Sequence, residues 1–233
     1  MISIIIPTYN EKGNILKLIR TIRKTLVKKN IYFEIIIIDD SSPDKTADIV
    51  KKKLLHKNIK VYERKRVRGL ATAILYGIRK AKGDVIVGID ADFNHPPEKI
   101  IDLVNKLNRY DLMIGSRFIK GGGMEERGRH NLTYFFNLFL KYILGFPTMD
   151  NMSGFYAIKR HDLLKLPIKK IYRGYGEYHL RLVHFAQKIG LRIGEIPIYY
   201  KKRQYGKSKS NLLKLFFQYI LVAFELKLRD DKI

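Results

Sequence analysis

The strongest constraint on the fold is the alternation of short, continuous runs of β-branched residues with amphipathic helical patterns. The runs expected to form strands occupy residues 3–7, 33–38, 59–62, 85–89 and 112–115. The helical patterns between them occupy residues 15–26, 70–80 and 98–107, and Ser42 followed by Pro43 predicts the start of a further helix. Strands that are apolar throughout and joined through helices are typical of a parallel sheet covered on both faces. The sequence therefore predicts an α/β fold with a mostly parallel sheet flanked by helices.

Polar side chains follow four of these predicted strands. They are Thr8 to Glu11, Asp39 and Asp40, Asp90 and Asp92, and Ser116 and Arg117. Ligands of open α/β sheets bind outside the carboxyl ends of the strands, so we expect these residues to gather in one site. Neither the P-loop pattern nor the glycine pattern of dinucleotide-binding folds follows any of the strands, which excludes those two ways of holding phosphate.

Asp90 and Asp92 indicate a divalent metal. They end the apolar run 85–89, and alternation along an extended chain directs both carboxylates to the same side. Carboxylate oxygens suit Mg²⁺ and Mn²⁺, and Mg²⁺ usually completes its shell with water and substrate phosphates. The alternative is that Asp92 and Asn94 only shape a turn. A turn or helix-start role also explains His95 as well as catalysis does.

The composition limits the possible partners and metals. The 233 residues carry a formal net charge of +24, which implies a polyanionic partner such as nucleic acid, anionic lipid headgroups or phosphates. The chain has no cysteine, so any metal must bind oxygen or imidazole ligands. No basic segment precedes the first apolar run, and we therefore expect no signal peptide and a cytoplasmic location.

The second half of the chain has a different character. Residues 120–129 are rich in glycine and charge, which suits a mobile loop over the site. Two helical patterns, over 130–144 and 211–229, are apolar around most of their circumference, which indicates burial in part and also helices lying in a membrane interface. Residues 200–209 hold five cations, a glycine and a serine, and form either a phosphate clamp or a solvated charge run.

Taken together, these segments resemble the inverting GT-A glycosyltransferases of family 2, and within it the polyprenyl-phosphate sugar synthases of the dolichol-phosphate mannose synthase type. The matching segments are Ile6 to Glu11, Asp39 to Thr46, Arg68 to Ala73, Asp90 to Glu98, Gly115 to Arg117, Ser153 to Phe155, and Arg203 to Lys209. The resemblance implies a Rossmann-like GT-A domain over residues 1–210, with an acceptor loop at 119–129 and an interface helix at 130–144. It also implies a C-terminal amphipathic membrane-interface helix over 211–233.

The resemblance further implies roles for individual residues. The nucleoside pocket would be lined by Pro7, Tyr9, Glu11 and Asp40. The metal and the diphosphate would be held by Asp90, Asp92 and Asn94, with Asp92 the more direct ligand. Catalysis, through stabilisation of the sugar-nucleotide diphosphate, would rest on Asp92, Arg117, Arg203 and Lys209. The acceptor phosphate would contact Arg117, Arg129 and Ser153.

Three positions depart from the family pattern. Asp150-Asn151-Met152 replaces the usual Asp-Pro-Thr before Ser-Gly-Phe, and Tyr156 stands where a basic residue is common. In the helix near 178–189, Arg181 lies close to the place of the family's carboxylate and Glu177 is the nearest acid, which leaves the donor sugar open. The chain resembles the short type of the family, whose relatives can depend on a separate small membrane subunit.

The expected activity is inverting transfer of mannose from GDP-mannose to dolichyl or polyprenyl phosphate, with Mg²⁺ or Mn²⁺ as cofactor, at the cytoplasmic face of the cell membrane. A lipid phosphate has a second pKa of about 6, so it is already an anionic nucleophile at neutral pH and needs no strong general base. Single displacement then inverts the anomeric centre.

The sequence supports four alternative functions less well. The main alternative is a glucosyl or other hexosyl transferase that uses a UDP-sugar. A processive polysaccharide synthase is disfavoured, because its Gln-x-x-Arg-Trp signature needs a tryptophan and the chain has none. A nucleic-acid-binding module ranks far behind, because the clustered aspartates would repel a phosphate backbone. A purely structural membrane-surface protein would predict that Asp92 is dispensable.

Overall fold

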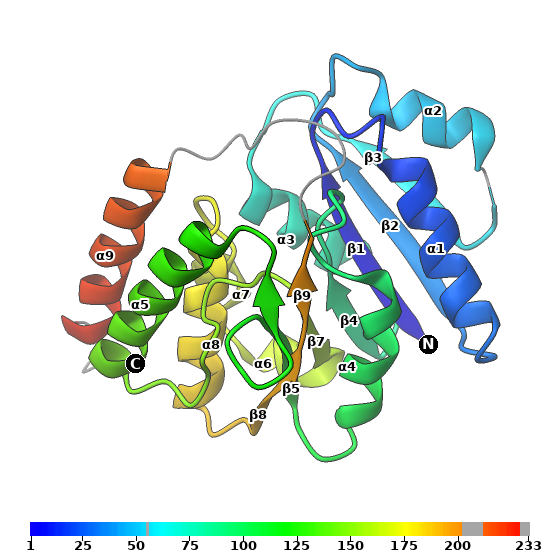
Figure 1. The fold of residues 1–233 in the computed structure, drawn as a ribbon. Helices are drawn as coiled ribbons and strands as arrows, with labels where there is room; N and C mark the ends of the chain where they lie inside the picture. Colours follow the sequence, from blue (N-terminus) through cyan, green and yellow to red (C-terminus); the bar gives the residue numbers. More distant parts are fainter. Residues whose placement is uncertain (55, 202–211, 229–233) are drawn as a thin grey trace.

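The computed structural model describes residues 1–54, 56–201 and 212–228, and its centre is a seven-stranded sheet (Figure 1). The strands of this sheet are β1 (Ile2–Thr8), β2 (Phe33–Asp39), β3 (Ile59–Glu63), β4 (Val85–Gly88), β5 (Leu112–Ser116), β7 (Tyr156–Lys159) and β8 (Ile193–Pro197). They lie in the order β3-β2-β1-β4-β7-β5-β8, and β7 runs antiparallel to both of its neighbours. The other pairings are parallel. The predicted α/β fold with a mostly parallel sheet is confirmed.

Helices cover both faces of the sheet (Figure 1). They are α1 (Ile15–Val27), α2 (Thr46–Lys53), α3 (Leu70–Lys80), the 3-10 helix η1 (Pro97–Lys99), α4 (Ile100–Lys106), α5 (Arg127–Leu144), α6 (Arg160–Lys165), α7 (Ile168–Ile171), α8 (Tyr178–Lys188) and α9 (Leu212–Leu228). The period-two alternation of β1 explains the two layers. Ile4 and Ile6 pack in the core shared with α1, α2 and α4, whereas Ile5 packs in the core shared with α3, α5, α8 and α9.

The start of α2 differs from the prediction. The helix begins at Thr46 rather than at Pro43. The carboxylate of Asp39 accepts the backbone N–H of Ser42 at 2.8 Å, and that of Asp44 accepts the N–H of Thr46 at 3.0 Å. Side chains that bond to nearby backbone in this way compete with the helix, so residues 42–45 form a turn instead of its first turn.

The segment predicted as an acceptor loop is also more ordered than expected. It contains the short strand β6 (Gly123–Met124), which pairs with β9 (Tyr199–Tyr200), and α5 begins at Arg127 instead of His130. The start of the predicted phosphate clamp, Tyr200, is therefore paired with the segment predicted to cover the site. Residues 202–209 of the predicted clamp, Arg203 and Lys209 among them, lie outside the described residues.

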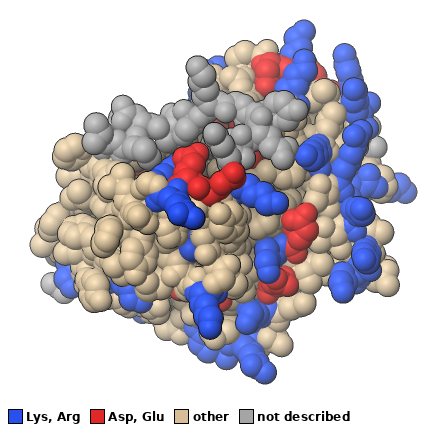
Figure 2. Space-filling model, in the orientation of Figure 1, with Lys and Arg blue, Asp and Glu red and all other residues tan. Residues whose placement is uncertain are grey.

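Helices α5 and α9 pack side by side, with the rings of Phe136 and Phe216 4.1 Å apart. Each exposes an apolar stripe at helical spacing: Leu132, Phe135, Phe139 and Tyr142 on α5, and Phe217, Leu221, Phe224 and Leu228 on α9. Figure 2 shows that the side of the molecule over these two helices is mostly uncharged, whereas lysine and arginine gather over α1 and α2 on the opposite side. In the described part of the chain, none of the helices is long and apolar enough to span a bilayer.

Candidate active site

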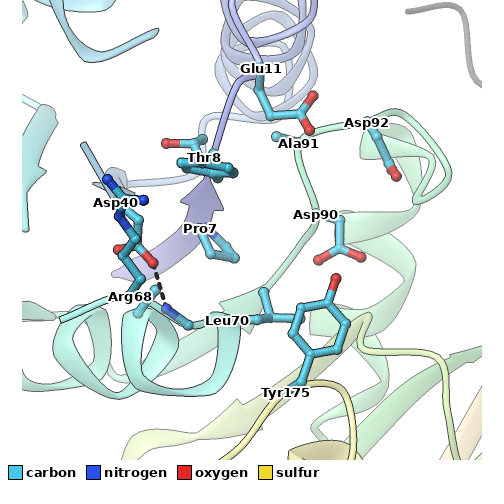
Figure 3. A pocket seen from close by; sticks show the side chains of 13 residues that line it. Pro7, Thr8, Glu11, Asp40, Arg68, Leu70, Asp90, Ala91, Asp92 and Tyr175 are labelled. Carbon is cyan, nitrogen blue, oxygen red and sulfur yellow. Dashed lines mark hydrogen bonds between the residues drawn. The ribbon is translucent and has the colours of Figure 1, made fainter. Parts of the chain in front are cut away.

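A cavity of about 410 Å³ opens at the carboxyl ends of β1, β2 and β4 (Figure 3). Its wall includes every residue predicted for the nucleoside pocket and both predicted metal aspartates: Pro7, Tyr9, Glu11, Asp40, Asp90 and Asp92. The turn before α3 adds Arg68 and Gly69, and the loop before α8 adds Tyr175. Three of the four strand ends that were predicted to gather in one site therefore meet in one cavity, whereas Ser116 and Arg117 are not among the residues that line it.

Asp40 forms part of the wall of the cavity and is also tied firmly to the protein. Its carboxylate accepts hydrogen bonds from Nε and Nη2 of Arg64 at 2.6 and 2.7 Å, and from the N–H of Gly69 at 2.8 Å. Both members of the Arg64–Asp40 pair are buried. The pair fixes the turn that carries Arg68, whose guanidinium lies 5.6 Å from the centre of the Tyr9 ring. A flat aromatic wall beside a fixed carboxylate suits a nucleoside base.

Asp92 is held by a tight turn after β4. The N–H of Asn94 donates to Oδ1 of Asp92 and its side-chain amide donates to Oδ2, both at 3.0 Å. The intervening Phe93 adopts a left-handed backbone with φ of 64°, which is unusual for an aromatic residue. Asn94 is not among the described residues that line the cavity, so here it orients the carboxylate of Asp92.

His95 joins three segments beneath the acidic turn. Its Nδ1 accepts the N–H of Asp90 at 2.9 Å, so the proton of the neutral ring lies on Nε2. Nε2 is 2.9 Å from the carbonyl of Ser153 and 2.7 Å from the hydroxyl of Tyr200, and the ring stacks on Phe155. The imidazole is buried and connects the Asp90 turn to the Ser-Gly-Phe motif and to β9. Of the roles that the sequence left open for His95, these contacts are those of a residue that shapes the turn.

Arg117 lies inside the protein, away from the described wall of the cavity. Nε and Nη2 donate to the two carboxylate oxygens of Asp150, each at 2.7 Å. The guanidinium also lies 4.8 Å from the centre of the Tyr200 ring. The predicted contact of Arg117 with phosphate stays a prediction, and its observed role is to join β5 to the loop before β7.

Glu195 on β8 supports Asp150 from the other side. Its carboxylate accepts the N–H groups of Met149 and Asp150 at 2.9 and 3.0 Å. Burial raises the pKa of Glu195, and these hydrogen bonds oppose the rise. Nothing in the local pattern of β8 marks Glu195 as important, because its partners lie about 45 residues away.

The other predicted acceptor residues occupy two different places. The hydroxyl oxygen of Ser153 accepts the N–H of Phe155 at 3.3 Å, and Ser153 is buried below the Asp90 turn. Arg129 lies in the first turn of α5, and its buried Nε has no hydrogen-bond partner among the described residues. Arg129 therefore has a buried donor that the described residues leave unused.

The donor set suits a divalent cation that also binds its substrate. Asp90 and Asp92 offer hard carboxylate oxygens on one side of the cavity. The described residues contain no group of three or more histidine, aspartate or glutamate side chains that could hold a metal alone. Mg²⁺ binds in this way, through one or two carboxylates plus phosphates and water. The residues present therefore fit a metal shared between the protein and a diphosphate.

Comparison with known proteins agrees with this geometry. The family model described as Glycosyl transferase family 2 matches residues 3–166. A Pyrococcus furiosus dolichol-phosphate mannosyltransferase is 31% identical over 97% of this chain, which spans 63% of that protein's length. A Micrococcus luteus undecaprenyl-phosphate mannosyltransferase is 30% identical over 88% of this chain and 85% of its own. A Mycolicibacterium smegmatis polyprenol monophosphomannose synthase is 29% identical over 92% of this chain and 84% of its own.

Solved structures share the fold at lower identity. Glucosyl-3-phosphoglycerate synthase from Mycobacterium tuberculosis, in complex with Mn²⁺, UDP-glucose and phosphoglyceric acid, superposes with a TM-score of 0.69. The two sequences are 19% identical, and the match covers 97% of this chain and 79% of that one. At this identity the likeness establishes the architecture of the sheet and its helices.

Proposed function

Because the chain belongs to glycosyl transferase family 2, we propose that it transfers mannose from GDP-mannose to a polyprenyl or dolichyl phosphate, with inversion at the anomeric carbon. The observation that carries the proposal is one cavity in which a nucleoside wall lies beside Asp90 and Asp92. Three relatives named for mannosyl transfer to dolichol phosphate, undecaprenyl phosphate or polyprenol support the choice of sugar and acceptor.

The reaction depends more on stabilising the negative charge of the leaving diphosphate than on a strong base. An oxygen of the lipid phosphate forms a bond to the anomeric carbon, and the bond from that carbon to the diphosphate breaks, with its electron pair leaving on GDP. Bound Mg²⁺ or Mn²⁺ supplies positive charge to the leaving diphosphate. Asp90 and Asp92 would hold that metal, and through it the diphosphate end of the donor, while Tyr9, Asp40 and Arg68 orient its base. Arg203 and Lys209 remain proposed as further contacts to the diphosphate.

The acceptor side is proposed to lie at the membrane surface. The exposed stripes of α5 and α9 together offer eight large apolar side chains on two adjacent helices, a pattern suited to a helix pair resting in the headgroup region. Arg129, at the start of α5, would then lie where a lipid phosphate enters. Arg117 and Ser153 would act on the acceptor through the shape of the site, since both are engaged inside the protein.

A lipid-product assay tests the proposal. The purified protein is incubated with Mn²⁺ or Mg²⁺, vesicles that contain a polyprenyl phosphate, and GDP-mannose labelled in the sugar. Labelled lipid is expected, and Asp92→Ala should abolish it. Labelled lipid formed from UDP-glucose instead would overturn the proposal that GDP-mannose is the donor. It would favour the alternative of a hexosyl transferase that uses a UDP-sugar, and a structurally similar enzyme binds UDP-glucose. No lipid product from either donor would overturn the proposal as a whole.

A further inference from the structure

The loop between α7 and α8 places one aromatic residue in the cavity that no sequence motif predicts. Tyr175 lines the wall next to Asp90, and Figure 3 shows its hydroxyl pointing toward that carboxylate. The residue is 38% exposed, so its ring is neither part of the core nor free in solvent. In Figure 3 it stands beside Asp90, on the opposite side of the cavity from Asp40.

The backbone around Tyr175 is fixed by buried polar contacts. The carboxylate of Glu177 accepts the N–H of Tyr175 at 3.1 Å, and Glu177 is 5% exposed. Gly174 has a φ of 74°, and a Cβ there would lie 1.9 Å from Glu177 Oε1, so only glycine lets the carboxylate reach this position. Arg181 Nη1 lies 4.0 Å from the same carboxylate and donates to the carbonyl of Arg173 at 3.0 Å.

A second contact fixes the loop from the side of α9. A Cβ at Gly176 would lie 2.8 Å from the hydroxyl of Tyr219, so α9 packs directly against the loop. Arg173 also forms an ion pair with Glu225 of α9 at 2.6 Å. The ring of Tyr175 is therefore presented to the cavity by a loop that is held at both ends. A side chain positioned in advance loses little conformational entropy when a ligand binds against it.

We propose that Tyr175 is a substrate-contacting residue that forms the wall against which the transferred sugar lies. This inference rests on the proposed function, because it takes the ligand to be a sugar nucleotide. In such a ligand the sugar lies beyond the diphosphate, on the side away from the base. With the base beside Tyr9 and the diphosphate beside Asp90 and Asp92, the next group meets Tyr175. A tyrosine ring offers an apolar face to the C–H face of a pyranose and a hydroxyl to its oxygens.

Paired titrations separate contact with the sugar from contact with the nucleotide. Affinities for GDP and for GDP-mannose are measured by calorimetry with Mn²⁺ present. Tyr175→Ala should raise the Kd for GDP-mannose about tenfold and that for GDP less than about twofold. Tyr175→Phe, which keeps the ring, should stay within about threefold of wild type for both. Tyr32→Ala, at an 85% exposed tyrosine outside the cavity, is the matched control and should change neither value.

Each other outcome has a defined meaning. Equal losses for GDP and GDP-mannose, no loss for either, or a loss in Tyr175→Phe as large as that in Tyr175→Ala would overturn the role of the ring. If wild type binds UDP-glucose and not GDP-mannose, the donor proposal fails, and the same comparison with UDP and UDP-glucose decides the role of Tyr175. A wild-type protein that binds no sugar nucleotide overturns both proposals.

Discussion

Arg117 donates to the carboxylate of Asp150 with its backbone N–H as well as with its guanidinium, the three bonds measuring 2.7 to 3.0 Å. Burial alone would raise the pKa of Asp150, but the charge and hydrogen bonds of Arg117 outweigh it and hold that pKa below its usual range. The pair links the end of β5 to the loop that precedes the Ser-Gly-Phe motif.

Breaking this pair should destabilise the protein strongly. Asp150→Ala leaves the guanidinium of Arg117 buried without its counter-charge, and we expect the free energy of unfolding to fall by about 3–5 kcal/mol. Urea unfolding at pH 7 measures the change. Asp102→Ala is the control, since Asp102 pairs with Lys99 at the surface and should cost at most about 1 kcal/mol. Similar losses in the two variants would contradict the structural role of Asp150.

His179 should make the protein sensitive to mild acid. The ring is fully buried, and neither nitrogen has a hydrogen-bond partner among the described residues. Burial lowers its pKa to about 4. The unfolded chain therefore takes up a proton near pH 6.5 and the folded chain only near pH 4. The contribution of the neutral His179 ring to the free energy of unfolding is complete above pH 6.5. It is lost as the pH falls from 6.5 to 4, by about 3 kcal/mol in total.

A variant separates this histidine from other groups that titrate in the same range. His179→Leu removes the ring without removing a hydrogen bond that the described residues make. Urea midpoints are compared at pH 7, 5.5 and 4. Wild type should lose about 3 kcal/mol more than His179→Leu between the two extremes. Parallel losses in both proteins would show that His179 is protonated without cost to the fold.

Metal dependence should rest on Asp92. Asp92→Asn keeps the shape of the turn but removes the negative charge, and we expect kcat/KM for lipid mannosylation to fall at least about 100-fold. The Mn²⁺ concentration for half-maximal activity should rise about tenfold or more. Asp102→Asn, on the outer face of α4, should match wild type in both measurements. A full loss of activity on chelation that Mn²⁺ restores is expected for wild type.

The apolar stripe of α9 should govern binding to vesicles. Phe217 and Leu221 are 68% and 69% exposed, and each large apolar side chain transferred from water contributes about 1.5–3 kcal/mol when fully buried. The double variant Phe217→Ser, Leu221→Ser should weaken co-sedimentation with vesicles at least about tenfold, allowing for partial insertion. The control replaces Val27 and Tyr32, which are 58% and 85% exposed at and after the end of α1, by serine. Equal effects of the two pairs would rule out a specific membrane face.

The architecture and the cavity could be predicted because each depends on local pattern. The run 35–38 is apolar at every position, which is typical of a strand buried on both faces, and it is followed by acids that the sheet then delivers to its carboxyl edge. Asp40, Asp90 and Asp92 were expected together for this reason, and they do line one cavity.

The contacts that fix the site could not be predicted, because their partners are distant in the chain. Arg64 and Asp40 are 24 residues apart, and Arg117 and Asp150 are 33 apart. A basic chain offers many arginines, and no local pattern says which of them is buried against which acid. Tyr175 was missed for a related reason, since its place in the cavity depends on a glycine turn and on packing against α9.

The antiparallel direction of β7 affects which segment of the chain can vary in length and sequence during evolution. β5 leaves the sheet and β7 enters it at the same edge, where the N–H of Gly115 donates to the carbonyl of Phe155 at 2.9 Å. Both ends of the excursion 117–155 are therefore pinned beside one another, and closing a longer loop costs only slightly more free energy. The part of this excursion between Arg117 and Asp150 can therefore change in length without moving a strand of the seven-stranded sheet. Helix α5, which is proposed to meet the acceptor, lies within this excursion and can diversify while the strand ends proposed to hold the nucleotide stay the same.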